Sequence, residues 1–557
     1  STWIEFNTVW QTILWLPLLL LLIEKAIKSS GFSVLMKILM IFGVFSSITA
    51  GHPQDFLNTF FFFIVYAFIR VFTHKQWSRK KQIRFFIVEL LPLVGFPFLL
   101  ASIQLLPTME LFRNSARVPH DYASVVSSML VQWWQLPMVI FQDFFGNPAT
   151  KTNITGDYVN KSLSIGITGF FLSVIGILYA KKTFHKQYFM YAACIILFLV
   201  TNSPITKILY HIPIPIMSTG TPTRNLFLFL FSLSILAGYG FDYLQTNQRI
   251  RKGVLILITI FISLGLFTIF SPKFIPPLMV VAASGVLRKS FIIISALSVI
   301  ILLNIIILRR YGKAAMYVLV ILSITELFYG FQKFNPFVPS SFVFPRNALI
   351  EFLQNHSGIN RFWGYGVSGI EANFATQTNI FSPDGTDPMN LSWYNEFVQS
   401  SKNGSIPETF NRKTRSDAQI QPGYGPDDLP ENAFRLKILD ILGVKYVVNR
   451  TENPISEKTF PIHRYSIAWE FGGWTVYENK NTSPRYFLTT SYDTYSSKKD
   501  FEKILFSPQF KTKSILISEH DKKNIPLLTG SVHEAKLLTY NPTKIAFETI
   551  TDGNQLF

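Results

Sequence analysis

The sequence predicts a polytopic α-helical membrane domain of about ten spans, followed by an α+β domain with a β-rich end. Three observations support this fold class. The 557 residues are 49% hydrophobic and 15% aromatic, and the mean hydropathy is +0.29. Apolar runs of about 20 residues, the length of helix that crosses a bilayer, recur up to residue 331. From residue 332 onward the apolar runs become short and alternating, and Gly, Pro and Asn become more frequent.

The expected spans follow one another along the first part of the chain. They lie at 9–24, 32–50, 56–73, 85–106, 162–180, 188–203, 225–244, 254–271, 290–308 and 314–331. The run 274–287 is too short to cross a bilayer and contains Pro276 and Pro277. We therefore expect an interfacial or re-entrant segment there.

Clusters of Lys and Arg follow alternate spans. They are Lys25 with Lys28, Arg79 to Lys81 with Arg84, Lys181 with Lys182, Arg249 with Arg251 and Lys252, and Arg309 with Arg310. Because basic loops are retained on the cytoplasmic side, these clusters are expected inside, and only Arg288-Lys289 falls on the opposite side. The loops 51–55, 107–161 and 204–224 are then expected outside, as is the chain after residue 331. We expect a multi-pass protein of the cytoplasmic membrane with an exoplasmic C-terminal domain.

The sequence divides into a membrane domain, 1–331, and a second domain, 332–557, which is long enough to fold independently. Helical spacing in the second domain predicts a helix near 431–442. Alternating patterns predict strands at 361–365, 444–449, 473–478, 485–490, 514–518 and 543–550. Cys194 is the single cysteine, so no disulfide within the chain can form.

Both ends of the chain look internal. It begins at Ser1 without a signal segment, and its last residues follow an alternating stretch that is typical of an interrupted sheet. We expect a fragment that lacks both natural ends.

The first polar loop, Gly51-His52-Pro53-Gln54, lies between two spans at the expected outer face. Pro53 interrupts the helix and Gly51 permits a tight turn. His52 can donate, accept or carry a proton near neutral pH, and with Gln54 it is a candidate substrate-binding group. The alternative is a hydrated interfacial turn whose polar groups satisfy broken backbone hydrogen bonds.

A second polar segment, 104–117, continues from the end of the fourth expected span. If it is helical, Glu110, Arg113 and Arg117 share one face. Two guanidiniums beside a carboxylate suit a phosphate head group, because Arg binds oxyanions in a fork geometry. Glu110 is therefore a candidate catalytic acid and both arginines are candidate substrate-binding residues. The alternative is a solvated interfacial helix with an internal ion pair.

The same loop contains Asp143 among aromatic residues, followed by Gly-Asn-Pro with Asn147. Partial burial would raise the pKa of a carboxyl group, so Asp143 is the second candidate catalytic residue, and Asn147 is a candidate substrate-binding residue. A turn-capping aspartate is the equally plausible alternative. Trp133-Trp134 upstream is typical of an interfacial anchor, and aromatic rings also stack on sugars.

Two charged residues near predicted helix ends complete the candidate site. Arg224 begins an apolar run, so it must reach the interface or pair, and it could complete an anion pocket with Arg113 and Arg117. A plain interface anchor is the alternative. Glu326 lies in the outer half of the last span and is a weaker candidate for the same site, whereas Glu89 is close enough to Arg84 to pair with it.

Several chemistries are excluded by what the sequence lacks. It contains no nucleotide-binding loop, no zinc motif of the HExxH kind, no Cys cluster and no nucleophile elbow. No cofactor is therefore predicted, no metal ligands are assigned, and a requirement for a divalent metal is left open. The net charge of +18 is explained by the basic loops, so nucleic acid is not expected as a partner.

Six segments occur in an order that resembles a known family. They are GHPQ at 51–54, QLLPTMELFRNSAR at 104–117, DFFGNP at 143–148, PTRNLFLFLFSLSILAGYGFDYL at 222–244, LDILGVKYVV at 439–448 and VYENKNTSPRYFL at 476–488. Together they resemble the YfhO family of bacterial membrane proteins, which is similar to the GT-C glycosyltransferases.

The resemblance implies an enzyme that takes a sugar from a polyprenyl-phosphate carrier in the lipid bilayer. It implies transfer on the outer face to an envelope polymer or glycan, such as a teichoic acid. GT-C enzymes usually carry a catalytic acid in their first outer loop, and no segment here matches that loop, so we expect the acid upstream of residue 1. Two alternatives remain: a transporter or flippase for lipid or glycan, and a non-catalytic envelope scaffold that binds glycans.

Overall fold

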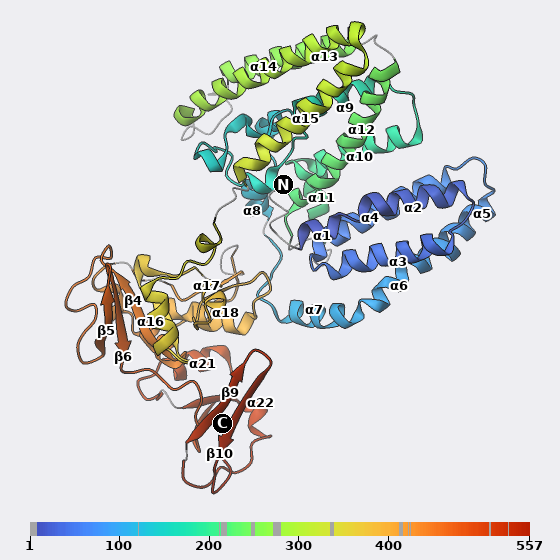
Figure 1. Cartoon of the computed structure of the whole chain (residues 1–557). Coiled ribbons are helices and arrows are strands. Elements are labelled where there is room, and N and C mark those ends of the chain that lie inside the picture. The colour runs from blue at the N-terminus through green and yellow to red at the C-terminus, as the bar shows by residue number, and fades with distance from the viewer. Residues whose placement is uncertain are drawn as a thin grey trace. The chain divides into compact units, whose positions relative to one another are not determined.

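The computed structural model describes residues 8–120, 122–210, 212, 220–246, 251–270, 280–334, 339–371, 373–411, 416–421, 423, 425–511, 514–532 and 534–557. The chain forms two compact units (Figure 1). The first comprises Ser1–Pro107 and Pro119–Phe337, and the second comprises Thr108–Val118 and Val338–Phe557. The predicted boundary at residue 331 therefore falls within α15 (Lys313–Phe334), the last helix of the first unit.

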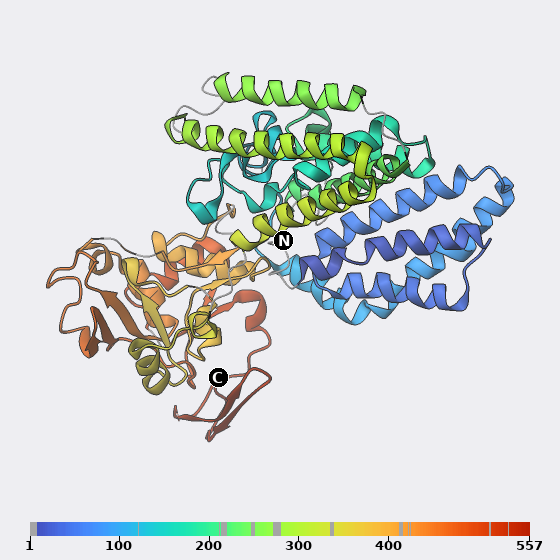
Figure 2. The ribbon, with the colours of Figure 1, turned by 45° about the horizontal axis from the view of Figure 1, so that its top comes forward.

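Helices make up most of the first unit. The longer ones are α2 (Leu16–Lys28), α3 (Val34–Thr49), α4 (Pro53–Phe72), α6 (Leu91–Leu100), α9 (Ile167–Tyr179), α10 (Phe184–Val200), α12 (Leu226–Thr246), α13 (Arg251–Phe270), α14 (Val280–Tyr311) and α15. Shorter elements are α1 (Val9–Ile13), α5 (Arg79–Arg84), η2 (Phe85–Leu90), α8 (Tyr122–Ser124), η3 (Val125–Met129), η4 (Trp133–Val139), η5 (Gln142–Phe145), η6 (Pro148–Thr150), η7 (Val159–Lys161), α11 (Pro204–Tyr210) and η8 (Pro222–Asn225). Helices α2, α3, α4 and α6 lie side by side, in blue in Figures 1 and 2.

Seven helical stretches of the described chain are long and apolar enough to cross a membrane. They are Val9–Lys28, Pro53–Phe72, Arg79–Leu100, Pro222–Thr246, Lys252–Phe270, Ser284–Asn304 and Lys313–Gln332. The prediction of about ten spans is not confirmed. The other three expected spans coincide with apolar helices of 16, 13 and 17 residues, namely α3, α9 and α10.

The interfacial or re-entrant segment expected at 274–287 stays a prediction. Residues 271–279 lie outside the described chain, but residues 280–287 form the first turns of α14, a helix of 32 residues. Arg288 and Lys289 lie within this helix and within its candidate span. The prolines precede the described helix, so they do not interrupt it.

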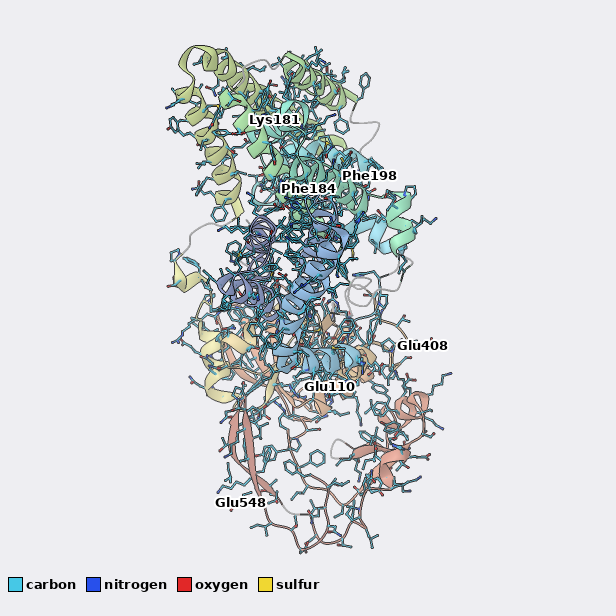
Figure 3. All side chains as sticks on the ribbon, turned by 90° about the vertical axis from the view of Figure 1, so that its right-hand side faces the viewer. Glu110, Lys181, Phe184, Phe198, Glu408 and Glu548 are labelled. Atoms are coloured by element: carbon cyan, nitrogen blue, oxygen red, sulfur yellow. The ribbon has the colours of Figure 1, made fainter. Side chains whose placement is uncertain are left out.

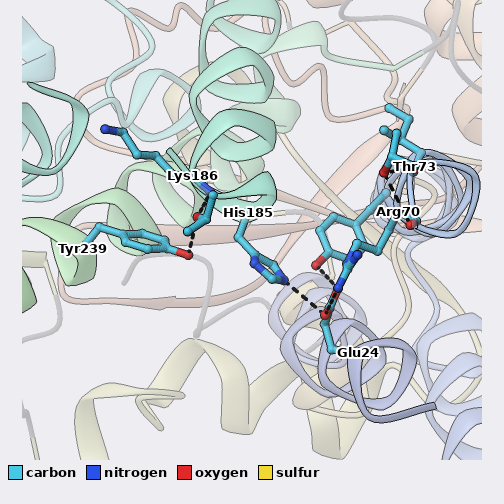
Figure 4. A network of polar contacts seen from close by, with 9 residues as sticks. Glu24, Arg70, Thr73, His185, Lys186 and Tyr239 are labelled. Carbon is cyan, nitrogen blue, oxygen red and sulfur yellow. Dashed lines mark hydrogen bonds and ion pairs between the residues drawn. The ribbon is translucent and has the colours of Figure 1, made fainter. Parts of the chain in front are cut away.

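Charged side chains join the ends of three helices on one side of the first unit (Figure 4). Arg70 Nε, at the end of α4, lies 2.8 Å from Glu24 Oε1, near the end of α2. His185 Nε2, at the start of α10, lies 3.2 Å from Glu24 Oε2, and the Tyr66 hydroxyl donates to Glu24 Oε1 at 2.7 Å. Helices α2 and α4 therefore run in the same direction and α10 runs against them, as the predicted alternation of spans requires.

The opposite helix ends are joined by a second set of contacts. Arg224 Nη1, in η8 before α12, lies 3.3 Å from Asp55 Oδ2 in the first turn of α4. Glu326, in the last helix α15, accepts hydrogen bonds from the backbone N–H groups of Ile167 and Thr168, at the start of α9. Asp55, Arg224 and Glu326 therefore lie at these helix ends.

Helices α9 and α12 approach closely because glycines face each other at their crossing. A Cβ atom on Gly176 would lie 2.1 Å from the Leu236 carbonyl oxygen, and one on Gly240 would lie 1.9 Å from the Leu172 carbonyl oxygen. Ser173 adds a hydrogen bond of 3.1 Å to the Leu233 carbonyl oxygen. Small residues of this kind allow helix backbones to pack in direct contact within a membrane.

The second unit is organised around a four-stranded sheet. Its order is β1 (Arg361–Gly364), β4 (Val444–Arg450), β6 (Trp474–Asn479) and β5 (Tyr465–Phe471). Strands β1 and β4 are parallel, and the other pairs are antiparallel. Alternate strand residues are buried on both faces, because helices cover each side of the sheet. Phe362 and Val448 belong to the cluster of α16 (Ala348–His356), and Trp363 and Val447 belong to that of α20 (Ala433–Ile441).

Smaller elements complete the second unit. The helical ones are η11 (Ser340–Phe342), η12 (Gly366–Ser368), α17 (Phe374–Gln377), α18 (Ser392–Gln399), η13 (Ser400–Lys402), α19 (Asp428–Glu431), α21 (Lys498–Leu505) and α22 (Glu519–Lys522). Three strand pairs stand apart from the main sheet: β2 (Gly385–Thr386) with β3 (Asp417–Ala418), β7 (Tyr492–Tyr495) with β8 (Ile515–Ser518), and β9 (Ala535–Asn541) with β10 (Lys544–Thr549).

Five of the six predicted strands and the predicted helix at 431–442 match elements of the second unit. The strand predicted at 485–490 is wrong. That segment forms no strand and has only an isolated bridge, from Thr489 to Leu556. Its alternating pattern arises because Leu488 is buried and Tyr486 packs its ring against Phe547.

The segment Thr108–Val118 belongs to the second unit, although it lies within the loop expected to join two spans. Helix α7 (Ser102–Asn114) runs into this segment and ends one residue before the segment pairs with another stretch of backbone in the second unit. Ser115 then forms an isolated antiparallel bridge with Leu391, and the Ala116 N–H donates to the Asn390 carbonyl oxygen at 2.9 Å. This backbone pairing fixes the segment to the loop before α18.

Candidate functional site

Two adjoining cavities in the first unit gather the polar side chains of several loops and helices. The larger, of about 510 Å³, is lined by Asp143, Tyr158 and Glu326 among other residues. The smaller, of about 80 Å³, is lined by polar residues from α4 and the loops, namely Asp55, Asn160, Thr223 and Arg224. Ser162 and Leu230 line both cavities, so the two are neighbours.

Asp143 lies in the short helix η5 and is 9% exposed. Its Oδ1 atom accepts hydrogen bonds from the Tyr158 hydroxyl and, at 3.0 Å, from Asn147 Nδ2. Burial raises the pKa of the Tyr158 phenol, and the charge of Asp143 raises it further, so the phenol remains a donor at neutral pH. These contacts hold a carboxylate at the cavity wall in one orientation.

Asn147 positions this carboxylate. Its side-chain Oδ1 accepts from the Ala149 N–H at 2.9 Å and so caps η6, while Nδ2 reaches Asp143. Gly146 is required between them, since its φ is +87° and a Cβ there would lie 2.1 Å from the Thr152 carbonyl oxygen. The Gly-Asn-Pro turn predicted from the sequence is therefore capped by Asn147 and supports Asp143.

Glu326 brings a second carboxylate to the larger cavity. It accepts from the N–H groups of Ile167 and, at 3.2 Å, Thr168, and thereby caps the first turn of α9. Unpaired N–H groups and the helix dipole both favour negative charge at this position. Gly166, with φ +86°, makes room for it, because a Cβ there would lie 2.9 Å from Glu326 Oε2. The last span thus contributes an acid to the same cavity as Asp143.

His52, Asp55 and Arg224 form a cluster beside the smaller cavity. His52 Nδ1 lies 3.0 Å from Asp55 Oδ2 and 3.3 Å from the Asp55 backbone nitrogen, so it can donate to the first or accept from the second. Arg224 Nη1 lies 3.3 Å from the same carboxylate oxygen. Arg224 is therefore paired rather than a simple interface anchor.

Gln54 fastens the two loops that hold this cluster. Its Nε2 atom donates to the Thr221 carbonyl oxygen at 2.8 Å, and its Oε1 atom accepts from the Thr221 N–H at 3.2 Å. Gly220 permits this approach, since a Cβ there would lie 2.4 Å from the Gln54 side chain. Both polar ends of Gln54 are thus used for structure, which supports a positioning role.

Glu110, Arg113 and Arg117 belong to the second unit, whereas both cavities belong to the first. The expected helical face is confirmed for Glu110 and Arg113, which lie one turn apart on α7, and is wrong for Arg117, because the helix ends at Asn114. Glu110 and Arg113 are exposed on α7, and Figure 3 labels Glu110 on this helix. Arg117 is half-buried, and its Nη1 atom donates to the Pro388 carbonyl oxygen at 3.2 Å.

The paired tryptophans of the same loop divide their roles. Trp134 packs edge-on against Phe145 with ring centroids 5.0 Å apart, so it belongs to the support of η5. Trp133 is 51% exposed and donates from Nε1 to the Asn202 carbonyl oxygen at 3.1 Å. Trp133 is the one suited to an interface.

Within the described ranges, no group of three or more His, Cys, Asp or Glu side chains is arranged to hold a metal ion. The cavities instead offer carboxylate, amide and hydroxyl oxygens, the phenols of Tyr158 and Tyr329, and the guanidinium of Arg224. Such a set can accept a proton from a hydroxyl group and hold an anion nearby.

Four residues of this site were not predicted from the sequence: Asp55, Tyr158, Asn160 and Thr223. Asp55 directly follows the Gly-His-Pro-Gln motif, so its position gave a signal, but an acid in the first turn of a helix is commonly a dipole-stabilising residue. Tyr158, Asn160 and Thr223 gave no signal, because their roles depend on contacts between distant loops.

The family comparison covers nearly the whole chain. Residues 1–554 match the family model described as bacterial membrane protein YfhO. Comparisons with curated proteins and with solved structures gave no match. The chain, with its membrane helices, its mixed second unit and this full-length match, belongs to the YfhO family of bacterial membrane proteins.

Proposed function

We propose that this protein transfers a sugar from a polyprenyl-phosphate carrier to a hydroxyl group of an envelope polymer on the exoplasmic face of the bacterial cytoplasmic membrane. The observation that carries the proposal is the larger cavity, where Asp143 and Glu326 lie on the wall. It adjoins the smaller cavity, which Arg224 lines. A proton acceptor and an anion-binding group thus occur side by side, as glycosyl transfer from a phosphate requires.

In the proposed step, Asp143 accepts the proton of the acceptor hydroxyl as its oxygen attacks the anomeric carbon. The bond between that carbon and the phosphate oxygen breaks, and the polyprenyl phosphate leaves with the electron pair. Attack opposite the leaving group inverts the anomeric configuration. Tyr158 and Asn147 orient the Asp143 carboxylate. Arg224 stabilises the negative charge on the phosphate, and its position is held by Asp55, which His52 also contacts.

Asp143 is a better candidate base than Glu110. Asp143 is buried at a cavity and oriented by hydrogen bonds, whereas Glu110 is exposed on α7. We assign Arg113 and Arg117 of the second unit to recruitment of an anionic acceptor polymer, since Arg binds phosphodiesters well.

An apolar groove supports a lipid carrier. It has a volume of about 580 Å³ and is lined by one face of α4, from Asn58 to Thr73, and by one face of α10. The stretch of α4 corresponds to about 22 Å of helix, about three quarters of the roughly 30 Å of the hydrocarbon core. Asn225 lines the groove and the adjacent Arg224 lines the smaller cavity, so a phosphate near Arg224 would have an apolar path for its chain.

The proposal is tested by transfer of a radiolabelled sugar in proteoliposomes that contain the full-length protein, polyprenyl-phosphate sugar and an envelope polymer. Arg224→Ala should raise the KM for the donor about tenfold or more, because it removes the phosphate-binding charge. Arg346→Ala, in the second unit and not among the residues that line either cavity, is the matched control. No polymer-bound label with the unaltered protein, or an unchanged donor KM in Arg224→Ala, would contradict the proposal.

A further inference from the structure

The smaller cavity is lined by three side-chain oxygens that have no hydrogen-bond partner within the part of the chain that the structure describes. They are Asp55 Oδ1, Asn160 Oδ1 and Thr223 Oγ1, and each atom is buried. Asp55 is 1% exposed and Thr223 is 2% exposed. A buried polar atom without a partner is costly, so three of them around one cavity indicate that something else fills their hydrogen bonds.

Neighbouring contacts fix which atoms face the cavity. Asn160 Nδ2 donates to Asp157 Oδ2 at 2.6 Å, so the amide is oriented and its oxygen is left over. The Asn160 backbone N–H also donates to Asp157, at 3.3 Å. The other oxygen of Asp55 is already occupied, because His52 and Arg224 both contact Oδ2. Two acceptors and one hydroxyl therefore remain for a ligand.

This combination selects the chemistry of the ligand. Carboxylate and amide oxygens only accept hydrogen bonds, so the part of the ligand that meets Asp55 Oδ1 and Asn160 Oδ1 must present donors, and an anionic group would be repelled at these two atoms. Arg224 beside Asp55 disfavours a cation. A neutral group with several hydroxyls fits. The remaining wall includes Val9, Leu226 and Leu230, which suit the C–H face of a sugar ring.

We propose that the smaller cavity binds the hydroxyl edge of the transferred sugar and so decides which sugar the protein accepts. Asp55 Oδ1 and Asn160 Oδ1 accept from two ring hydroxyls, and Thr223 exchanges a hydrogen bond with the same edge. This inference rests on the proposed function, because it places the sugar between Arg224 and the larger cavity. With about 80 Å³, the cavity holds part of a ring and not a whole disaccharide.

Thr223→Val is the most informative substitution, because it exchanges a hydroxyl for a methyl group of similar size. Binding is measured with the full-length protein in nanodiscs, using polyprenyl phosphate with and without glucose, galactose or N-acetylglucosamine. The preferred sugar should bind more tightly than bare polyprenyl phosphate, and Thr223→Val should reduce that ratio about tenfold. Thr12→Val is the matched control, since the Thr12 hydroxyl is also buried but donates to the Thr8 carbonyl oxygen.

Monodeoxy forms of the preferred sugar locate the contact. One monodeoxy sugar should bind the unaltered protein less tightly than the preferred sugar does. Its affinity should not fall further in Thr223→Val, because both changes remove the same hydrogen bond. Thr223→Val should also fold at least as stably as the unaltered protein, because it removes a buried hydroxyl without a partner. Loss of binding can then not be attributed to misfolding.

The two proposals fail in different ways. If the ratio between sugar-bearing and bare carrier is the same in the unaltered protein and in Thr223→Val, the cavity holds ordered water and the inference is overturned, whatever the transfer assay gives. If the ratio and the deoxy series behave as expected but no sugar reaches a polymer, the binding site stands and the proposed transfer is contradicted.

Discussion

At the residue scale, Asp143 and Asp384 show how local surroundings decide what a carboxyl group can do. Asp143 accepts hydrogen bonds from Tyr158 and Asn147, which hold its carboxylate in one orientation at the cavity wall. Asp384, in the second unit, accepts one hydrogen bond of 2.8 Å from the Ile420 N–H. Burial raises the pKa of Asp384 from 3.8 to about 7. The first is suited to accept a proton in a reaction, whereas the second holds a proton in the folded state.

The raised pKa of Asp384 predicts that the second unit loses stability as the pH rises. Below about pH 4 the carboxyl is protonated in both the folded and unfolded states; between about pH 4 and pH 7 only the folded state retains the proton. The free energy of unfolding should therefore fall by up to about 4 kcal/mol across this window, because each of the roughly three pKa units is worth about 1.4 kcal/mol, and then level off. The pH dependence of hydrogen exchange at the Ile420 amide in the full-length protein measures this loss of stability.

Asp384→Asn provides the control for this effect, because an amide mimics the protonated carboxyl at every pH. Comparison of the two proteins at each pH removes the intrinsic pH dependence of exchange. Protection at Ile420 should be similar in both at about pH 4 and greater in Asp384→Asn at about pH 8. Equal protection at both pH values would contradict the assignment.

At the element scale, helix contacts in the first unit depend on small residues at defined positions. The crossing of α9 and α12 requires Gly176 and Gly240, and a methyl group on Gly240 would lie 1.9 Å from the Leu172 carbonyl oxygen. Gly240→Ala should therefore lower the free energy of unfolding by about 1–3 kcal/mol. Thermal unfolding in detergent, followed by the helical circular dichroism signal, measures the change.

Gly238→Ala is a matched control, because it lies on the same helix and its Cβ would meet no atom within 4 Å. It should leave the melting temperature unchanged or raise it slightly, since alanine favours a helix more than glycine does. A similar loss in both variants would mean that the helix itself, and not its crossing with α9, is sensitive.

The sequence predicted the helices of the first unit well, because each apolar run is long and continuous. It could not separate spans of full length from apolar helices of 13 to 17 residues, since both read as hydrophobic segments. The candidate site was predicted in part. His52, Asp143 and Arg224 lie at the cavities or beside them, because polar residues at apolar helix ends are unusual.

The rest of the site depends on tertiary contacts that no local pattern encodes. Asp55 meets Arg224 across 169 positions of sequence, and Glu326 caps a helix that starts 159 positions earlier. The sequence pattern predicted that Arg117 lies on a helix, but the helix ends at Asn114. It ends there because Ser115 pairs with Leu391, and this pairing competes with helix formation. Contacts of this range are determined by the fold as a whole.

At the scale of the whole molecule, the arrangement of charge along the helices predicts an orientation. Glu24, Arg70 and His185 meet at helix ends that adjoin basic loops, and Asp55 meets Arg224 at the opposite ends. Basic loops remain in the cytoplasm, so the cavities should open toward the outside.

This orientation is tested with cysteines introduced into a Cys194→Ser background, since Cys194 is exposed. Glu408→Cys, in the second unit, should react with a membrane-impermeant maleimide in intact cells. Lys182→Cys, in a basic loop, should react only after the membrane is permeabilised. The reverse pattern would place the second unit in the cytoplasm and rule out transfer on the outer face.

The central claim is that Asp143 accepts the proton in glycosyl transfer, and kcat of Asp143→Asn in proteoliposomes tests it most directly. The amide keeps the shape of the side chain but cannot accept the proton, so kcat should fall about 100-fold or more with little change in the donor KM. Glu408→Gln, an exposed acid in the second unit, should transfer at the normal rate. A normal kcat in Asp143→Asn, above all together with a large loss in Glu110→Gln, would contradict the account.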